Sequence, residues 1–385
     1  MAAVTLAGGS NRILQEILKG SRRCPASLAP GCWGCSQGAK RYLLRDDAVG
    51  LKDFQQKKLA TKSLMSEDKD TYFRNIEEKM EKNRMILKIE LKRLLHLCQT
   101  SDDVEIARKV IYRYHSENRN VSFGDYKFGP IFMRLCYELD LEILAKELIK
   151  DENLYGFFSD VQSFNILMDK LFTKGHYEGA YEMLEEMKKQ HVRFTTDTYL
   201  LAFAICYKLN SPATWKVCTE LLEEAQLKEI KIGKRAYVFA IVLALKQNDI
   251  EKARYIYSLI TKKDDRLCTN LKILIETKSG ALELVLKTLK ETLEVYTSPL
   301  GKAVQVSEEV LTTIREELTE DSAFLVELED ICNQLRSSGQ VTSLTVDEMM
   351  CHVPFVKKYS TTMLSKEKRV SRRTFLPLQS TLIAE

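Results

Sequence analysis

The sequence predicts an all-α protein, a solenoid of stacked helical hairpins, and three observations favour this fold class. Residues that break helices are rare, because the 385 residues include only 7 prolines and 16 glycines. Hydrophobic residues make up 45% of the chain, and they recur at the three-and-four spacing that gathers them on one helical face. Pairs of such helices then recur along the chain. We therefore expect about five to six hairpins in a right-handed superhelix, with the first helix of each pair on the concave side.

The clearest hairpin spans residues 161–195. Its first helix has apolar residues on one face at Phe164, Leu167, Met168 and Leu171. Gly175 ends this helix, because glycine readily takes the left-handed conformation found at helix ends. The inward positions of the second helix are Ala180, Met183, Leu184 and Met187. So short a hairpin cannot offset the entropy lost on ordering it, and neighbouring hairpins must complete its core.

The turns of the other hairpins follow the same register. They are predicted at Asp102, Asp140, Gly175, Asn210, Asn248 and Ser279. After each of the first five turns comes a small residue, where the paired helices approach most closely: Ala107, Ala145, Ala180, Cys218 and Ala253. The array is therefore expected over residues 83–295, with the best repeat at 161–195.

The first 45 residues differ in composition from the rest of the chain. They hold seven bases and a single acid, and residues 11–19 can form an amphipathic helix. This pattern is typical of a mitochondrial presequence and predicts a matrix protein, with a disordered basic tail as the alternative. Arg41-Tyr42 is a suitable place for cleavage. Residues 46–82 are a charged lead-in, with a helix expected from about Ser66.

The segments beyond the array follow a different pattern. Two capping helices are expected within residues 296–350, one from Ser307 to Leu318 and one from Asp321 to Leu335. Residues 351–385 form a basic tail. The longest apolar run, residues 236–245, is half of a membrane span, so no membrane association is expected.

The hairpin at residues 161–195 carries a motif in each helix. These are residues 163–168 (SFNILM), Lys174-Gly175, Glu178, Ala180 and residues 184–188 (LEEMK). They resemble one complete repeat of the pentatricopeptide repeat (PPR) family. The resemblance implies binding of single-stranded RNA, with the fifth and the last residue of each repeat reading one base.

Carried over to this chain, the fifth residue is Asn165 and the last is Thr195, a pair that implies recognition of U or C. The fifth positions of the other repeats fall on Pro130, Leu200, Val238 and Asn270. Only Asn270 among these can read a base. The alternative for Asn165 is a hydrogen bond to backbone near the helix start.

A row of lysines favours contact with RNA phosphates. Lys208, Lys246 and Lys278 occupy the thirteenth position of three successive repeats, and Lys174 lies one place off in the repeat before them. Three further bases at a repeat junction could extend this track: Lys231, Lys234 and Arg235. The alternative is that a lysine in the last turn of a helix only offsets the helix dipole.

These patterns predict a non-catalytic RNA-binding protein in the maturation, processing or stability of mitochondrial transcripts, and hence needed for respiratory chain function. The expected partners are single-stranded mitochondrial RNA and RNA-processing proteins, with no small-molecule substrate, cofactor or metal. The five histidines are isolated, and the cysteines outside the presequence are read as reduced core residues. A protein–protein scaffold in the mitochondrial matrix is the alternative, favoured by the apolar fifth positions Leu200 and Val238.

Overall fold

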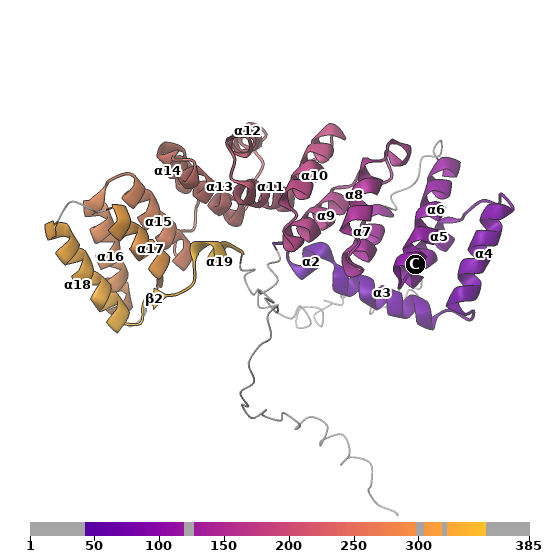
Figure 1. Ribbon diagram of the computed structural model, residues 1–385, viewed down its shortest axis with the longest axis horizontal. Coiled ribbons are helices and arrows are strands. Elements are labelled where there is room, and N and C mark those ends of the chain that lie inside the picture. The colour runs from indigo at the N-terminus through magenta and orange to yellow at the C-terminus, as the bar shows by residue number, and fades with distance from the viewer. Residues whose placement is uncertain (1–42, 119–126, 298–303, 318–321, 352–385) are drawn as a thin grey trace, which may run out of the picture. The chain divides into compact units, whose positions relative to one another are not determined.

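The computed structural model describes residues 43–118, 127–297, 304–317 and 322–351 (Figure 1). By its contacts the chain separates into residues 1–40 and residues 41–385, and all described elements belong to the second unit. The amphipathic helix expected at residues 11–19 and most of the basic tail lie outside the described residues.

The described part is an all-α helical-repeat solenoid, which confirms the predicted fold class. Its six central hairpins are α5 (Lys88–Leu97) with α6 (Ser101–Asn118), α7 (Gly129–Glu138) with α8 (Glu142–Lys150), α9 (Val161–Lys174) with α10 (Tyr177–Lys189), α11 (Thr196–Leu209) with α12 (Pro212–Leu227), α13 (Lys234–Lys246) with α14 (Ile250–Ser258), and α15 (Arg266–Lys278) with α16 (Leu282–Thr297). A 3-10 turn, η1 (Glu152–Leu154), follows α8.

Further elements flank these hairpins. They are α2 (Asp46–Val49), α3 (Leu51–Ser63) and α4 (Lys69–Glu81) on the N-terminal side, and β1 (Val306–Ser307), α17 (Glu308–Glu317), α18 (Ser322–Ser337), β2 (Val341–Thr342) and α19 (Val346–Cys351) on the C-terminal side. The strands β1 and β2 form a two-residue parallel bridge, which the sequence analysis did not anticipate. Helix formation also begins at Asp46, well before the expected start near Ser66.

The turn register is correct at four of the six predicted positions. Asp140, Gly175, Asn210 and Asn248 all have the left-handed backbone that ends a first helix. At the sixth turn this conformation belongs to Gly280, one residue after Ser279. The five predicted small residues are all fully buried.

The first turn lies earlier than predicted, and Asp102 is already inside α6. The neighbouring residue explains this shift. The carboxylate of Asp103 accepts hydrogen bonds from the backbone N–H groups of Gln99 at 2.7 Å and Thr100 at 2.9 Å. The chain therefore turns at residues 98–100, and the second helix starts at Ser101.

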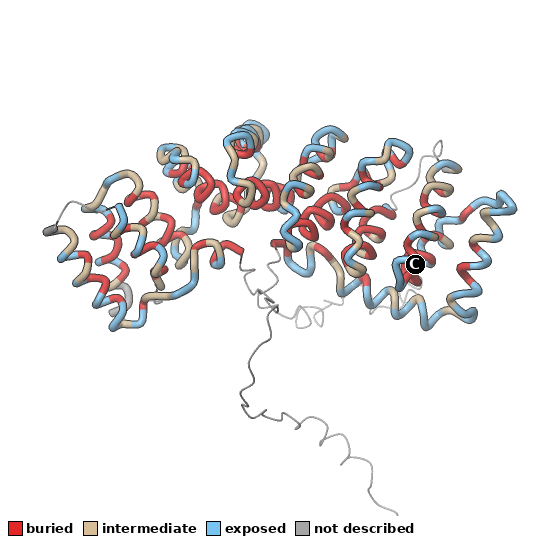
Figure 2. The backbone as a smooth tube through the Cα atoms, in the orientation of Figure 1, coloured by how far each residue is buried: buried red, intermediate tan, exposed pale blue. Residues whose placement is uncertain are grey.

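The first helices form the core of the solenoid. Ten consecutive residues of α11, from Thr198 to Tyr207, are buried. A helix that is apolar all round is buried on every side, and α11 packs against α9, α10, α12 and α13. Figure 2 shows the first helices buried while the outer ends of the second helices are exposed.

Short flanking helices cover the first helices from the side opposite the second helices. Helix α3 packs against α5 and α7, and α2 packs against α9 (Figure 1). At the C-terminal end α19 packs against α13 and α15. Stacking also continues past the six hairpins, because α17 packs on α15 and α18 on α16. None of the helices within the described ranges combines the length and apolar character needed to span a membrane.

Candidate nucleic-acid interface

Asn165 and Thr195, the two residues that the PPR resemblance pairs, are in contact. The side chain of Asn165 lies on α9 and is 7% exposed. Its Nδ2 atom donates to Thr195 Oγ1 at 3.4 Å, and its Oδ1 atom accepts from Thr198 Oγ1 at 2.9 Å. Thr195 caps α11 and is exposed. Thr195 Oγ1 also accepts from the N–H of Thr198 at 3.4 Å and lies 3.0 Å from Thr198 Oγ1, so its hydroxyl group is bonded within the protein at an exposed residue.

The other predicted base reader, Asn270, is in a different environment. Its side chain is fully buried. Nδ2 donates to the carbonyl oxygens of Arg266 at 2.7 Å and Gln305 at 3.0 Å, and Oδ1 accepts from the N–H of Ser307 at 2.8 Å. The prediction that Asn270 reads a base is therefore wrong in this conformation, because its side chain is fully buried and both its amide atoms are bonded to the backbone of Arg266, Gln305 and Ser307.

Two of the predicted phosphate-binding lysines lie beside the C-terminal helix. Lys208 Nζ is 2.6 Å from the carboxylate of Asp347 on α19. Lys246 is exposed, and its Nζ lies 4.2 Å from the ring centre of Tyr207. The acid that pairs with Lys208 neutralises part of the predicted row on the first-helix face.

The remaining members of the row also have acidic partners. Lys174 pairs with Asp140 at 3.1 Å, and Lys278 pairs with Glu317 on α17. Both lysine side chains are at most half exposed, and both are paired with an acid. A continuous phosphate track along the thirteenth positions is therefore not supported.

The three junction bases differ from one another. Lys231 is exposed. Lys234 pairs with Asp265 at 2.9 Å. Arg235 points the other way: its Nη1 donates to the carbonyl oxygen of Leu43 at 2.8 Å, and burial lowers the pKa of its guanidinium. The predicted phosphate contact at Arg235 is therefore wrong in this conformation, because it binds the protein's own backbone.

The N-terminal residues of the described part lie across the same face. Oδ1 of Asp169 accepts from the N–H groups of Leu43 at 3.2 Å and Leu44 at 2.9 Å, and Oδ2 accepts from Tyr137 at 3.1 Å. Burial raises the pKa of Asp169 to about 6. Since Leu43 and Leu44 are buried, the predicted presequence boundary at residue 45 lies inside the folded part.

The repeat junctions form a basic edge that the sequence analysis only partly found. Thr196 Oγ1 donates to the carbonyl oxygen of Lys231 at 3.4 Å, and Lys234 Nζ donates to that of Lys262 at 2.6 Å. Successive junctions are thus neighbours. We name the exposed residues of these junctions the junction edge: Arg193, Thr195, Thr196, Lys231 and Lys262. Arg193 and Lys262 were missed in the sequence analysis. Their position shortly before the start of a first helix could have indicated that they belong to this edge.

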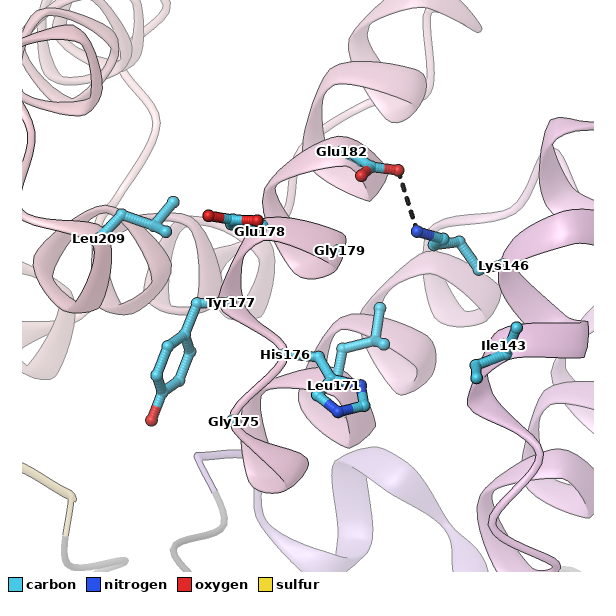
Figure 3. A pocket seen from close by; sticks show the side chains of 10 residues that line it. All are labelled: Ile143, Lys146, Leu171, Gly175, His176, Tyr177, Glu178, Gly179, Glu182 and Leu209. Carbon is cyan, nitrogen blue, oxygen red and sulfur yellow. Dashed lines mark hydrogen bonds and ion pairs between the residues drawn. The ribbon is translucent and has the colours of Figure 1, made fainter.

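A cavity of about 500 Å³ lies between α8 and the turn from α9 to α10 (Figure 3). Its wall includes Leu171, His176 and Tyr177, and Lys146 pairs across it with Glu182 at 3.1 Å. No residue of the junction edge lines this cavity. Within the described ranges, no three His, Cys, Asp or Glu side chains gather as a metal site would require.

Comparison with known proteins agrees with these features. The sequence model of the MRP-S27 family, described as mitochondrial 28S ribosomal protein S27, matches residues 33–366. Pentatricopeptide repeat-containing protein 2, mitochondrial, from Homo sapiens is 50% identical over 383 residues, which cover 98% of this chain and 97% of the human protein. The chain belongs to the MRP-S27 family.

The relatives named pentatricopeptide repeat-containing protein 2 confirm the resemblance to the PPR family. The Xenopus laevis pentatricopeptide repeat-containing protein 2 is 49% identical over 91% of this chain. A more distant relative is the mitochondrial 15S rRNA processing factor CCM1 of Saccharomyces cerevisiae, 25% identical over 129 residues, or 30% of this chain and 15% of the yeast protein. These names associate the relatives with mitochondria, and one of them with RNA processing.

Proposed function

We propose that this protein binds single-stranded RNA in the mitochondrial matrix, without catalysis of its own, and acts in the maturation, processing or stability of a transcript. The observation that carries the proposal is the contact between Asn165 and exposed Thr195, the fifth and last positions of the best PPR repeat. The distant relative named as an rRNA processing factor supports the same class of role.

The chemistry of the junction edge suits a short stretch of RNA. A hydroxyl group both donates and accepts hydrogen bonds, so Thr195 would bond to the Watson–Crick edge of a pyrimidine in exchange for its contacts with Thr198. Asn165 fixes the position of that hydroxyl from behind. Arg193, Lys231 and Lys262 are exposed on the same edge and provide positive charge for phosphates.

The extent of the RNA contact is limited by the covered first helices. Lys208, Asn270 and Arg235 all contact segments from outside the hairpins. One readable position contributes only about 1–3 kcal/mol of discrimination, by analogy with base contacts in DNA. Selection of one transcript would then need RNA shape or an RNA-processing partner, and loss of that transcript would lower respiratory chain assembly.

Charge reversal on the junction edge tests the proposal. The double variant Lys231→Glu/Lys262→Glu should bind a labelled oligo(U) at least about tenfold more weakly at low salt, because two phosphate contacts become repulsive. Lys216→Glu, an exposed lysine on α12, is the matched control and should bind as the wild type does. Equal binding by the double variant and the control would contradict the proposal.

A protein–protein scaffold is the second candidate function, and one observation favours it. The first-helix face binds polypeptide backbone, since Asp169 and Arg235 hold the main chain of residues 43–44. A scaffold would show little salt-dependent affinity for oligo(U).

A further inference from the structure

The N-terminal end of the described solenoid has a groove that lies away from the junction edge. A cavity of about 590 Å³ opens between α3, the loop that leads into α4, and α5. Figure 1 shows these three helices together at the end of the array where the chain enters it. The groove is independent of the surface assigned above to RNA.

The groove exposes large apolar side chains. Leu64 on the α3 side is 85% exposed and Ile89 on α5 is 63% exposed, and both line the cavity. Met65, which is partly buried, also lines the cavity beside them. Single exposed apolar residues are ordinary, but Leu64 and Ile89 face one concavity from two helical segments, which is typical of an interaction site.

The floor of the groove is formed by groups with satisfied polar atoms. Tyr72 donates its hydroxyl to the carbonyl oxygen of Glu90 at 3.0 Å. His96 lies buried, its Nδ1 is 2.7 Å from the carbonyl oxygen of Lys92, and burial lowers the pKa of its ring. These polar atoms of the two side chains already have partners, so the floor suits an apolar side chain.

The rim of the groove is basic. Lys57 on α3 and Lys92 and Arg93 on α5 are exposed and line opposite sides. Glu67 is the one acid among the residues that line the cavity. Apolar surface between two basic walls is complementary to a helix with leucine-like residues on one face and acids on its flanks.

We propose that the groove between α3 and α5 docks an acidic amphipathic helix of a partner protein. This goes beyond RNA binding and uses a surface that the RNA does not need. Apolar anchors at successive helical turns would fill the space between Leu64 and Ile89, and flanking acids would pair with Lys57 and Arg93. RNA suits the groove less well, because phosphates gain nothing from exposed Leu64 and Ile89.

The test uses the full-length protein and two labelled synthetic peptides of about 16 residues. Both peptides have leucine at the three-and-four spacing, and the other positions are mainly glutamate in one and lysine in the other. Fluorescence anisotropy should show saturable binding of the acidic peptide only. The variant Leu64→Ser/Ile89→Ser should weaken that binding at least about tenfold, and Lys57→Glu/Arg93→Glu should do the same.

The control is Val326→Ser, a residue on α18 that is equally exposed, and it should bind the acidic peptide as the wild type does. The proposal is overturned if both peptides bind alike, or if Leu64→Ser/Ile89→Ser leaves the acidic peptide bound. Loss of oligo(U) binding by that variant would instead assign the groove to RNA. Conversion of a dimer to a monomer by that variant, measured by sedimentation, would assign it to a second copy of the chain.

Discussion

The ammonium group of Lys208 lies 2.6 Å from the carboxylate of Asp347, which is 139 residues further along the chain. Lys208 belongs to a first helix, and Asp347 belongs to α19, which packs against α13 and α15. The contact joins the C-terminal end of the described chain to the face on which RNA was expected. It divides that face into a covered part and the exposed junction edge.

Removing the acid should make the covered face more favourable to RNA. In Asp347→Asn, Lys208 loses its partner and a negative charge disappears beside exposed Lys246. A half-buried ion pair of this kind is worth about 1 kcal/mol, so oligo(U) affinity at low salt should rise about fivefold. Asp330→Asn, an exposed acid on α18, is the control. An unchanged affinity in Asp347→Asn would mean that RNA does not approach Lys208.

The two asparagines at fifth positions should respond differently to substitution. Asn165→Ala should abolish the preference for oligo(U) over oligo(A), because Thr195 loses the amide that positions it. Its free energy of unfolding should fall by about 1 kcal/mol. Asn270→Ala should lose about 2–3 kcal/mol, because it leaves buried backbone groups of Gln305 and Ser307 unpaired. If Asn270→Ala changed the base preference in competition binding and Asn165→Ala did not, Asn270 rather than Asn165 would be the residue that reads the base.

Asp169 should make stability depend on pH. Its pKa is raised to about 6 from 3.8 by burial, so the folded protein binds more protons than the unfolded chain between about pH 4 and 6. The free energy of unfolding therefore falls as pH rises through this window, by at most about 3 kcal/mol. Asp169→Asn keeps an oxygen acceptor for Leu43 and Leu44 and should lose this decline.

Urea unfolding at pH 5 and pH 7.5 measures the Asp169 effect as a difference between variant and wild type. Asp169→Asn should be the more stable of the two at pH 7.5. Exposed Asp197→Asn, at the start of α11, should keep the wild-type pH dependence. If the free energy of unfolding of Asp169→Asn fell with pH as much as that of the wild type, the role given to the buried carboxylate would be contradicted.

Two glycines in helices should have opposite responses to alanine. A Cβ atom at Gly129 would lie 2.3 Å from Ser163 Oγ and 2.7 Å from Asp160 Oδ2, the groups that cap α9. Gly129→Ala should therefore destabilise the protein by about 2–4 kcal/mol. At Gly179 the nearest atoms would be 3.7 Å away, so Gly179→Ala should stabilise it by up to about 1 kcal/mol. Thermal unfolding of both variants compares the signs directly.

The periodic part of the fold could be predicted because its causes are local. Ala180 and Gly175 mark their hairpin through their own size and backbone freedom, and the same local rule located Asn210 and Asn248. The first turn was misplaced because the cap that starts α6 comes from Asp103, one residue beyond the predicted turn residue. Such a shift in a helix boundary leaves the apolar pattern unchanged.

The covered face could not be predicted because its contacts join distant, non-periodic segments. Asn270 bonds to backbone groups of Gln305 and Ser307. Every residue type has the same backbone carbonyl group, so the sequence does not indicate which backbone groups a side chain will bind. Arg235 likewise bonds to the carbonyl oxygen of Leu43, 192 residues away. Asn165 and Thr195 could be paired in advance because the resemblance to a PPR repeat implies that its fifth and last residues act together.

The salt dependence of oligo(U) binding by the full-length protein tests the central claim most directly. Each phosphate contact to single-stranded RNA contributes a slope of about −0.7 in log K against log salt concentration. Contacts from Arg193, Lys231 and Lys262 therefore predict a slope of about −2. Absence of binding at low ionic strength, or binding that does not change with salt, would contradict the account.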